Sequence, residues 1–344
     1  MSIILVPYPA RGHIAPFLRM GAELARRRIP VRMIVPPPHA RAVAAAGVVP
    51  VVIGSDEGAR VPPGWSRSDL AARRAAAVRR RRTALEMQAV FDREVAAFPP
   101  SAVLLDPHAR WLRRLSRSGR RIWLWTTSSS APRCAAPALV NGLPALAAPS
   151  RRARFVAPLH GGFPVPGEEF PYHRLAGRKL LVVSFGTVFG RRPGMLRWIA
   201  ESFRGTPWDV VLSTGRTEPA AVGPVPGNVI LASSIPQEKL LRRASALLTH
   251  GGMNSVLEAA AAGVPMLFAP RSGEQRRTAR RVIELGAGRL LDAGTSLARQ
   301  TERLRADDAV IGGARQLRAL VEAAPSVAEA ADRLVALADL APVC

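Results

Sequence analysis

The chain has 344 residues and a net charge of +24, and 48% of its residues are hydrophobic. This length is enough for two medium-sized domains, and the hydrophobic content supports a full core and excludes global disorder. Two cysteines are too few for a disulfide framework or a cysteine metal cluster, and no CxxC or HExxH spacing occurs.

The positive charge comes almost entirely from arginines that are spread over many segments. It predicts a general attraction to polyanions and to anionic lipid. Aromatic residues make up only 5% of the chain and no helix-turn-helix, zinc-finger or RNP pattern occurs, so we predict no specific nucleic-acid site. No apolar run reaches the roughly 18–20 residues of a bilayer span, and the N-terminus lacks the basic region of a signal peptide. These features predict a cytoplasmic protein with a peripheral attraction to membranes.

The first half of the chain is predicted to alternate strands with helices. A short buried strand at residues 3–6 leads through a loop into a helix at 14–28, whose apolar residues recur at helical spacing. Further elements are predicted as strands at 31–35, 51–53, 103–105 and 122–125 and as an arginine-rich helix at 70–98. The alternation predicts a parallel, doubly wound α/β sheet with its functional side chains at the carboxyl ends of the strands.

The second half is predicted to form another domain of the same kind. Between residues 131 and 177 the periodicity fades while proline and glycine increase, which indicates a boundary. The later elements are strands predicted at 180–185, 210–212, 229–231, 246–248 and 266–268 and a helix at 327–340. The prediction divides the chain into a shortened N-terminal domain (1–165), a linker (166–178), a C-terminal domain (179–326) and a terminal segment (327–344).

The segment Thr-His-Gly-Gly-Met-Asn-Ser at 249–255 is the most informative motif, because it follows an apolar strand and precedes a helix predicted at 256–262. Such a turn places free backbone N–H groups and a positive dipole end at one spot, where a phosphate or diphosphate binds. Gly251 and Gly252 let the backbone turn sharply and approach a ligand. Asn254 and Ser255 are expected to cap the helix or to donate to phosphate oxygens, and His250 is expected to donate a further hydrogen bond.

More polar residues follow this turn in a fixed order. Glu258 lies in the predicted helix, Gly263-Val264-Pro265 ends it, and the acid–amide pair Glu274-Gln275 follows the next strand. The run THGGMNS…EAAAAGVPM…EQ…ARRVIELGAG resembles the UDP-glycosyltransferase superfamily with the GT-B fold, and within it the bacterial macrolide glycosyltransferases. The resemblance implies two Rossmann-like doubly wound domains facing a cleft, with residues 327–344 packing back on the first domain.

The first half supplies the candidate catalytic residues. His13 follows the first strand at the edge of a helix, and Asp106 ends another strand. A histidine held by a carboxylate is an oriented general base. In the resembling family the matching histidine removes the acceptor proton and an aspartate stabilises the imidazolium, so we assign His13 as base and Asp106 as its partner. The structural alternatives are a helix-start residue without chemistry for His13 and a helix cap for Asp106.

The resemblance also assigns a donor-binding site in the second half. Besides residues 250–255, the expected donor-binding residues are Ser184, Gly186 and Thr187 at the β-phosphate, Ile235 and Gln237 at the base edge, Glu258 at the ribose, and Glu274 and Gln275 at the sugar. For Glu258 the alternative is an ordinary acid in the first turn of a helix, where it complements the dipole. The sequence departs from the family at Ser234, which stands where an aromatic residue normally stacks on the base.

These assignments predict an inverting glycosyltransferase that requires no metal, because the helix N-terminus binds the leaving diphosphate while His13 deprotonates the nucleophile. UDP-glucose is the first expectation for the donor, with a dTDP-deoxysugar as the alternative. The expected acceptor is a small hydroxylated natural product such as a macrolide. The first half is short and residues 128–154 are rich in Ala, Pro and Arg, so the acceptor pocket is expected to be small, open or completed by another subunit. The alternative hypotheses are a lipid-linked acceptor at a membrane and a non-catalytic nucleotide-sugar-binding or auxiliary protein.

Overall fold

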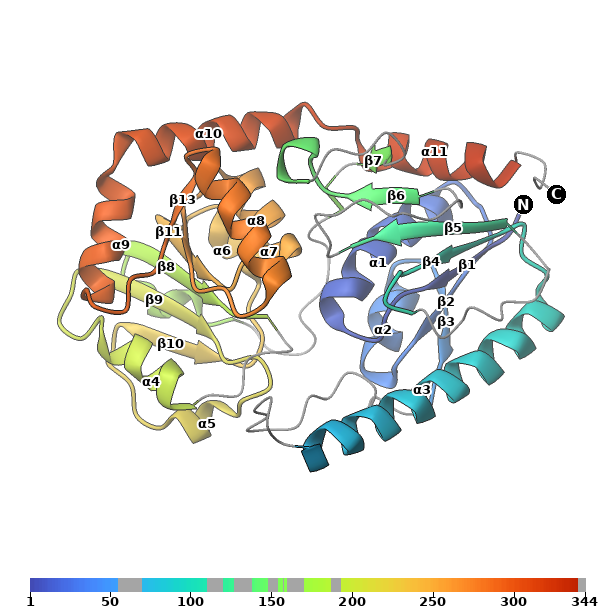
Figure 1. The fold of residues 1–344 in the computed structure, drawn as a ribbon, viewed down its shortest axis with the longest axis horizontal. Coiled ribbons are helices and arrows are strands. Elements are labelled where there is room, and N and C mark those ends of the chain that lie inside the picture. Colours follow the sequence, from blue (N-terminus) through green and yellow to red (C-terminus); the bar gives the residue numbers. More distant parts are fainter. Residues whose placement is uncertain are drawn as a thin grey trace. The chain divides into compact units, whose positions relative to one another are not determined.

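The computed structural model describes residues 1–54, 70–109, 120–126, 138–147, 154–156, 158–159, 170–186 and 193–339. The chain forms two compact units (Figure 1). Unit 1 comprises Met1–Gly142, Ala148–Phe163 and Pro325–Cys344, and unit 2 comprises Leu143–Ala147 and Pro164–Ala324. Each unit is built on its own parallel β-sheet.

The strands of unit 1 pair in the order β3-β2-β1-β4-β5-β6-β7, and every pairing is parallel. They are β1 (Ile3–Val6), β2 (Val31–Val35), β3 (Val49–Val52), β4 (Ala102–Leu105), β5 (Arg120–Trp125), β6 (Ala138–Asn141) and β7 (Arg154–Val156). All four residues of β1 are buried, with Ile3 and Leu5 in one core cluster and Ile4 and Val6 in another. A strand that is buried on both faces carries a continuous apolar run, which explains why the first strand reads IILV.

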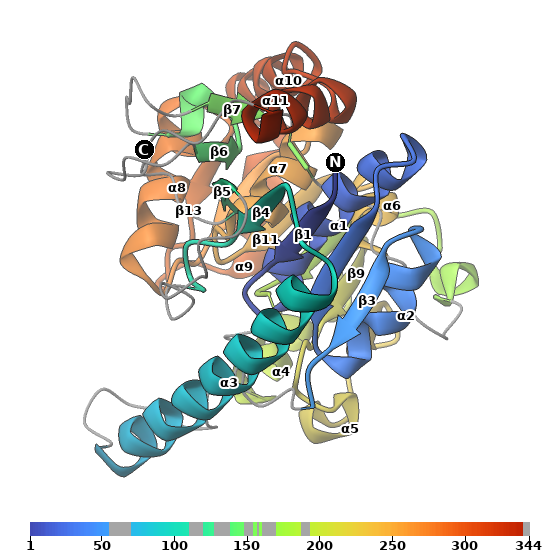
Figure 2. The ribbon, with the colours of Figure 1, turned by 90° about the vertical axis from the view of Figure 1, so that its right-hand side faces the viewer.

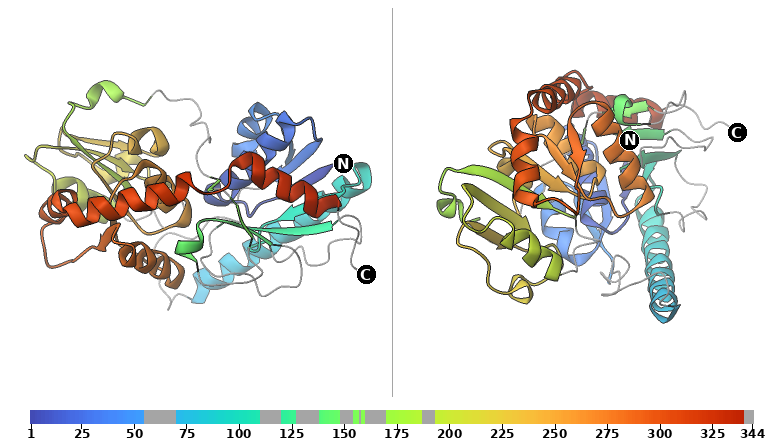
Figure 3. Two further views of the ribbon diagram at one scale, coloured as in Figure 1. Left: turned by 90° about the horizontal axis from the view of Figure 1, so that it is seen from above. Right: turned by 60° about the vertical axis from the view of Figure 1, so that its left-hand side comes forward.

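Helices cover both faces of the sheet in unit 1. They are α1 (Arg11–Arg26), α2 (Pro37–Ala45), α3 (Leu70–Ala97) and α11 (Val327–Asp339). Phe17 of α1 and Leu334 of α11 are buried in the cluster that contains Ile3 and Leu5, so the C-terminal helix packs within unit 1. Phe91 of α3 is buried on the opposite face. The N-terminal turns of α3 project past the strands (Figure 2; Figure 3, right).

The strands of unit 2 pair in the order β10-β9-β8-β11-β12-β13, again all parallel. They are β8 (Lys179–Ser184), β9 (Trp208–Ser213), β10 (Val229–Ala232), β11 (Ala246–Thr249), β12 (Met266–Phe268) and β13 (Gly288–Leu290). Alternate residues of β8 enter different core clusters, Leu180 and Val182 on one face and Leu181 and Val183 on the other. The sheet is therefore covered on both sides.

Among the described helical elements of unit 2, the longest is α10 with 15 residues. They are η3 (Pro144–Leu146), η4 (Tyr172–Arg174), α4 (Pro193–Glu201), α5 (Pro219–Val222), α6 (Gln237–Leu241), α7 (Met253–Ala262), α8 (Gly273–Glu284), α9 (Leu297–Ala306) and α10 (Asp308–Glu322). Leu257 of α7, Val282 of α8 and Leu317 of α10 lie in one core cluster, while Leu196 of α4 and Leu304 of α9 lie in the other.

Both sheets reverse their strand order at one point. In unit 1 the order turns between β1 and β4, and in unit 2 it turns between β8 and β11. In open α/β sheets, ligands bind outside the carboxyl ends of the strands at this switch point, because the loops on its two sides run to opposite faces of the sheet. The segments after these four strands are therefore the places where the fold itself predicts functional groups.

Several element boundaries differ from the sequence prediction. Helix α1 begins at Arg11 rather than at residue 14, because the His13 N–H already bonds to the Ala10 carbonyl at 2.8 Å. Helix α7 begins at Met253 rather than at 256. Strands β6 and β7 lie in the segment where the periodicity fades, and neither was predicted.

The predicted linker at 166–178 is described from residue 170 onward. Phe170 and Leu175 pack against the core of unit 2, so this part of the chain is bound to that unit rather than extended. Residues 161–167, the glycine- and proline-rich run, lie outside the described residues. Of the helices that the structure describes, none has the length and apolar character needed to span a bilayer.

Candidate functional site

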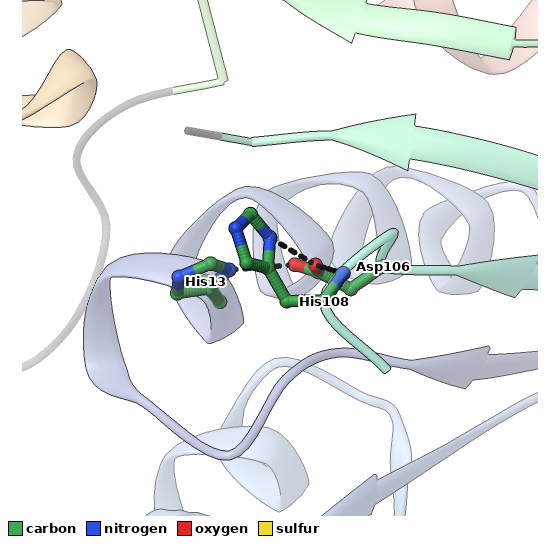
Figure 4. Close-up of side chains that lie close together, drawn as sticks. All are labelled: His13, Asp106 and His108. Atoms are coloured by element: carbon green, nitrogen blue, oxygen red, sulfur yellow. Dashed lines mark hydrogen bonds and ion pairs between the residues drawn. The ribbon is translucent and has the colours of Figure 1, made fainter. Parts of the chain in front are cut away.

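His13 and Asp106 meet at the switch point of unit 1. His13 lies in the first turn of α1, directly after β1, and Asp106 follows β4, the neighbouring strand. The His13 Nδ1 atom is 2.7 Å from Asp106 Oδ2 (Figure 4). The Asp106 side chain is fully buried, whereas 14% of the His13 side chain is exposed. The two residues are 93 positions apart in the chain and are brought together by the pairing of β1 with β4.

Asp106 is held by more groups than His13. Its Oδ1 atom accepts from the His108 backbone N–H at 2.7 Å and lies 3.1 Å from His108 Nδ1, and the Thr126 hydroxyl donates to Oδ2 at 3.1 Å. Burial by itself raises the pKa of the Asp106 carboxyl, but the charge of His13 and the hydrogen bonds from both histidines hold the pKa well below its usual range. Asp106 is therefore ionised at neutral pH.

An ionised carboxylate only accepts hydrogen bonds, so the proton of a neutral His13 lies on Nδ1, the atom that faces Asp106. The Nε2 atom then carries a lone pair and can accept a proton from a bound hydroxyl. The negative charge of Asp106 stabilises the imidazolium that this transfer creates. This geometry fits the general base assigned to His13 in the sequence analysis, and the assignment stays a prediction.

His108 was not assigned a role from the sequence. Its ring lies edge-on to that of His13, with ring centroids 4.9 Å apart. The ring centroids of Tyr8 and His13 are 5.1 Å apart. The side chain of His108 is 45% exposed. His13, Asp106 and His108 place three donor atoms within 4.8 Å of one another, a grouping that could also ligate a metal ion. The signal available in the sequence was the spacing Asp-Pro-His after a strand, which alone does not reveal that both histidines bind one carboxylate.

The donor-binding residues assigned from the sequence gather around the switch point of unit 2. The turn after β8 contains Gly186 with a φ of +69°, and the turn after β11 contains Gly251 with a φ of +85°. A Cβ atom on Gly252 would lie 2.6 Å from His250 Nε2, and one on Gly186 would lie 3.0 Å from His250 Cε1. The His250 ring therefore packs between the two turns, where only glycine leaves enough room. Thr187, the residue expected at the β-phosphate, lies outside the described residues.

His250 is neutral at physiological pH. Burial lowers its pKa to about 4, a hydrogen bond to the Ser184 backbone opposes this shift, and the positive charge of Arg271 adds to it. The hydrogen bond with Ser184 raises the pKa of His250, so an N–H of the imidazole donates to the Ser184 backbone carbonyl. The other ring nitrogen of a neutral histidine carries a lone pair and is an acceptor. The neutral ring lies between the two glycine turns, and donation from His250 to a phosphate stays a prediction.

The start of α7 differs from the prediction in its capping. Gly252 is the N-cap residue and has no side chain to cap the helix, so Asn254 and Ser255 do not occupy the N-cap position. Both residues lie in the first turn because the helix begins at Met253. Since α7 begins early, Glu258 lies beyond its first turn, and the alternative interpretation of Glu258 as a first-turn acid is wrong.

Gln237, Ser255 and Glu258 form one cluster. The Gln237 Nε2 amide donates to Glu258 Oε2 at 2.6 Å and to Ser255 Oγ at 3.1 Å. Ile235 is 6% exposed and is part of the core of unit 2, so only its backbone can face a ligand. The sequence analysis assigned these residues to the base and ribose, and the structure places their polar groups together at the side of α7 that faces α6.

Glu274 and Gln275, the acid–amide pair after β12, lie in the first turn of α8, which begins at Gly273. Gln275 forms a capping box with Ser272, and its Oε1 atom accepts from the backbone N–H groups of Arg271 and Ser272 at 2.8 and 3.2 Å. The carboxamide oxygen is thus occupied within the protein, and Nε2 is the group with which Gln275 would donate to a sugar hydroxyl. Sequence reasoning did not reveal this capping role, although Ser-Gly-Glu-Gln is the pattern of a capping box.

Comparisons with known proteins show which proteins this chain is similar to. Residues 201–337 match the family model described as the C-terminal domain of erythromycin biosynthesis protein CIII-like proteins. The crystal structure of the calicheamicin glycosyltransferase CalG4 superposes with a TM-score of 0.77 at 26% identity, over 99% of this chain and 100% of that one. The chain has the GT-B fold and carries an EryCIII-like C-terminal domain. The glycosyltransferase SnogD from Streptomyces nogalater shares this fold, with a TM-score of 0.76 at 23% identity over 98% of this chain and 99% of that one.

Curated relatives of this GT-B chain are antibiotic and nucleotide-sugar glycosyltransferases. The NDP-glycosyltransferase YjiC of Bacillus licheniformis is 33% identical over 56% of this chain and 49% of its own length. The demethyllactenocin mycarosyltransferase of Streptomyces fradiae is 37% identical over 45% of this chain and 35% of its own length. The matched part thus spans about half of the first relative and a third of the second. The resemblance to the macrolide glycosyltransferases and the GT-B fold predicted from the sequence are confirmed.

Proposed function

We propose that this protein is an inverting glycosyltransferase that moves a sugar from a nucleoside diphosphate donor to a hydroxyl of a small natural product. The observation that carries the proposal is the His13–Asp106 pair, with a 2.7 Å hydrogen bond at the switch point of the first sheet. A protein that only bound a nucleotide sugar would gain nothing from a histidine whose lone pair is oriented by a buried, ionised carboxylate.

In this proposal His13 is the general base. Its Nε2 atom takes the proton of the acceptor hydroxyl as the oxygen attacks the anomeric carbon, and the bond to the diphosphate breaks in the same displacement. Asp106 stabilises the imidazolium through the Nδ1 hydrogen bond. A positioned general base contributes about 10²- to 10⁴-fold to a rate. A single displacement inverts the anomeric configuration.

Unit 2 supplies the donor side of the reaction. The glycine turns after β8 and β11 and the N-terminus of α7 offer backbone N–H groups at one switch point, which suits a diphosphate. The carboxylate of Glu258 and the amide of Gln237 suit ribose hydroxyls and a base edge. Metal ions are not required for this chemistry in the proposal, since helix dipoles and side chains stabilise the leaving group.

The identity of the nucleotide is left to experiment between two candidates. Relatives at 31–37% identity include uncharacterized UDP-glucosyltransferases of Bacillus subtilis and a mycarosyltransferase. UDP-glucose is the first donor to test and a dTDP-deoxysugar the second. A macrolide or another polyhydroxylated antibiotic is the acceptor class that the family supports, and a lipid-linked acceptor is an outcome of the same test.

The proposal is tested by mass spectrometry of the purified protein with UDP- and dTDP-sugars and a library of hydroxylated compounds. We expect a sugar-sized mass gain on an acceptor, lost in His13→Ala and kept in His173→Ala, a matched change at an exposed histidine of η4. The anomeric coupling in the product then gives the stereochemistry. Transfer that survives in His13→Ala, or a product that retains the donor configuration, would contradict the mechanism.

A further inference from the structure

Arg271 lies beside the turns that the proposed function assigns to the donor diphosphate. It follows β12, the strand next to β11, and its backbone N–H donates to Gln275 Oε1 at 2.8 Å. Its guanidinium group extends back toward the switch point of unit 2. There the Nη2 atom contacts the Met195 sulfur at 2.6 Å, and the guanidinium carbon lies 5.9 Å from the centre of the Phe185 ring.

These contacts fix the guanidinium between two elements that border the switch point. Phe185 stands between Ser184, the last residue of β8, and Gly186, whose φ of +69° makes the turn. Met195 lies in the first turn of α4, the next helix in the chain. The aromatic ring of Phe185 and the thioether of Met195 both lie against the planar group. Arg271 therefore brings a positive charge to the end of β8, next to the turn after β11.

The electrostatics of His250 place the same charge near the second turn. Arg271 is among the groups that lower the pKa of His250, whose ring packs between Gly186 and Gly252. His250 is neutral and its N–H is used by the Ser184 backbone, so the histidine adds no charge to the site. Among these residues the fixed positive charge is that of Arg271.

A diphosphate leaving group carries more negative charge than backbone groups can balance. The N-terminus of a helix offers the equivalent of roughly half an elementary charge. An arginine supplies a full charge and a planar fork that binds two phosphate oxygens at once, and it stays protonated in any protein environment. The departing diphosphate gains charge as the glycosidic bond breaks, so a fixed cation stabilises the transition state more than the ground state.

We propose that Arg271 binds the diphosphate of the donor and stabilises it as it leaves. The assignment rests on the proposed function, because it presupposes a nucleoside diphosphate at the switch point of unit 2. Arg271 stands between the glycine turn and the acid–amide pair of the motif at 249–275, and the sequence analysis gave it no role.

The test separates the phosphate contribution from the rest of the ligand. Isothermal titration calorimetry gives the Kd of UDP, UMP and uridine, and of dTDP, dTMP and thymidine, for the wild type, Arg271→Gln and Arg271→Lys. Arg277→Gln, an exposed arginine of α8, is the matched control. A charge-assisted hydrogen bond is worth about 1.5–3 kcal/mol, so Arg271→Gln is expected to weaken diphosphate binding about 10- to 100-fold. Nucleoside binding should change less than twofold, Arg271→Lys should lie between the two, and the control should match the wild type.

The outcomes distinguish this assignment from the proposed function. A wild type that binds neither UDP nor dTDP overturns both. If the wild type binds a diphosphate and Arg271→Gln binds it with a Kd within twofold of the wild-type value, only the role of Arg271 is overturned. An equal loss of diphosphate and nucleoside affinity in Arg271→Gln also overturns it, because a merely structural arginine would weaken every ligand alike. Since the ratio of the two affinities is measured in the same variant, a general loss of folded protein does not mimic the expected result.

Discussion

His250 makes the stability of unit 2 depend on pH in a way that the structure allows to be calculated. Its pKa falls from the ordinary value of 6.5 to about 4 in the folded protein, chiefly because burial disfavours the charged ring. The folded state therefore binds the proton less readily than the unfolded state. Stability from this group is fully present above pH 6.5 and is lost as the pH falls through 4.

The magnitude follows from the two pKa values. A difference of roughly 2.5 units, at about 1.4 kcal/mol per unit, makes the full contribution about 3 kcal/mol. Between pH 7.5 and pH 5.0 the loss amounts to about 2 kcal/mol, before most carboxylates titrate. For a domain of this size, that loss lowers the Tm by about 4–8 °C.

The assay is differential scanning calorimetry of the wild type and His250→Gln at pH 7.5 and 5.0. The variant is expected to be less stable at pH 7.5, but its Tm should fall less on acidification, because glutamine does not titrate. His173→Gln removes an exposed histidine of the same unit and should retain the wild-type pH dependence. If the wild type and His250→Gln lose the same stability between these pH values, or if NMR titration gives His250 an ordinary pKa, the reasoning is refuted.

Three further substitutions test the two switch points. Asp106→Asn places an amide N–H₂ opposite His13 Nδ1, which moves the His13 proton to Nε2 and removes the base. The kcat should fall about 10²- to 10⁴-fold, and ¹⁵N NMR should report the changed tautomer. A variant that keeps a tenth of the wild-type kcat would contradict this. His108→Ala removes the 3.1 Å contact with Asp106 but leaves the backbone N–H bond, so kcat should fall only about fivefold, with the donor KM unchanged and His108→Asn restoring the rate. Gly252→Ala puts a Cβ atom 2.6 Å from His250 Nε2, and diphosphate affinity measured by calorimetry should fall at least about tenfold; an unchanged Kd would show that the ring moves aside freely.

The sequence was sufficient to predict that His13 and Asp106 meet at one edge of the first sheet. His13 and Asp106 each follow a short apolar run, and parallel strands bring their carboxyl ends to one edge, so the two could be paired without coordinates. The same holds for the glycine turn after β11, where Gly263 with a φ of +67° ends α7 as predicted. These features depend on local patterns and on the general topology of α/β sheets, which leave a clear record in a single sequence.

Contacts that depend on side-chain direction could not be predicted in this way. Nothing in the spacing of Asp106 and His108 shows that the backbone N–H and the ring of the same histidine both turn back on the carboxylate. Thr126, the residue after β5, donates to the same group, and its position depends on the register of β4 with β5. Strand β6 was missed because four residues at the edge of a proline-rich segment are too few for a period to be recognised.

In the proposed reaction, His13 and His250 are the same residue type in two different electrostatic surroundings. Each follows a strand at the switch point of its sheet, and the two differ in the charge beside them. The Nδ1 atom of His13 faces the buried carboxylate of Asp106, which accepts its hydrogen bond and leaves Nε2 as the atom that can accept a proton. His250 is buried near the cation of Arg271, which disfavours the imidazolium and keeps the ring neutral. In the proposed reaction the base gains a proton, whereas the neutral ring between the two glycine turns keeps its charge constant as the diphosphate leaves. Removing the carboxylate of Asp106 is therefore expected to impair proton transfer in unit 1. Placing a carboxylate beside His250 is expected to impair donor binding in unit 2, and the two changes act independently of each other.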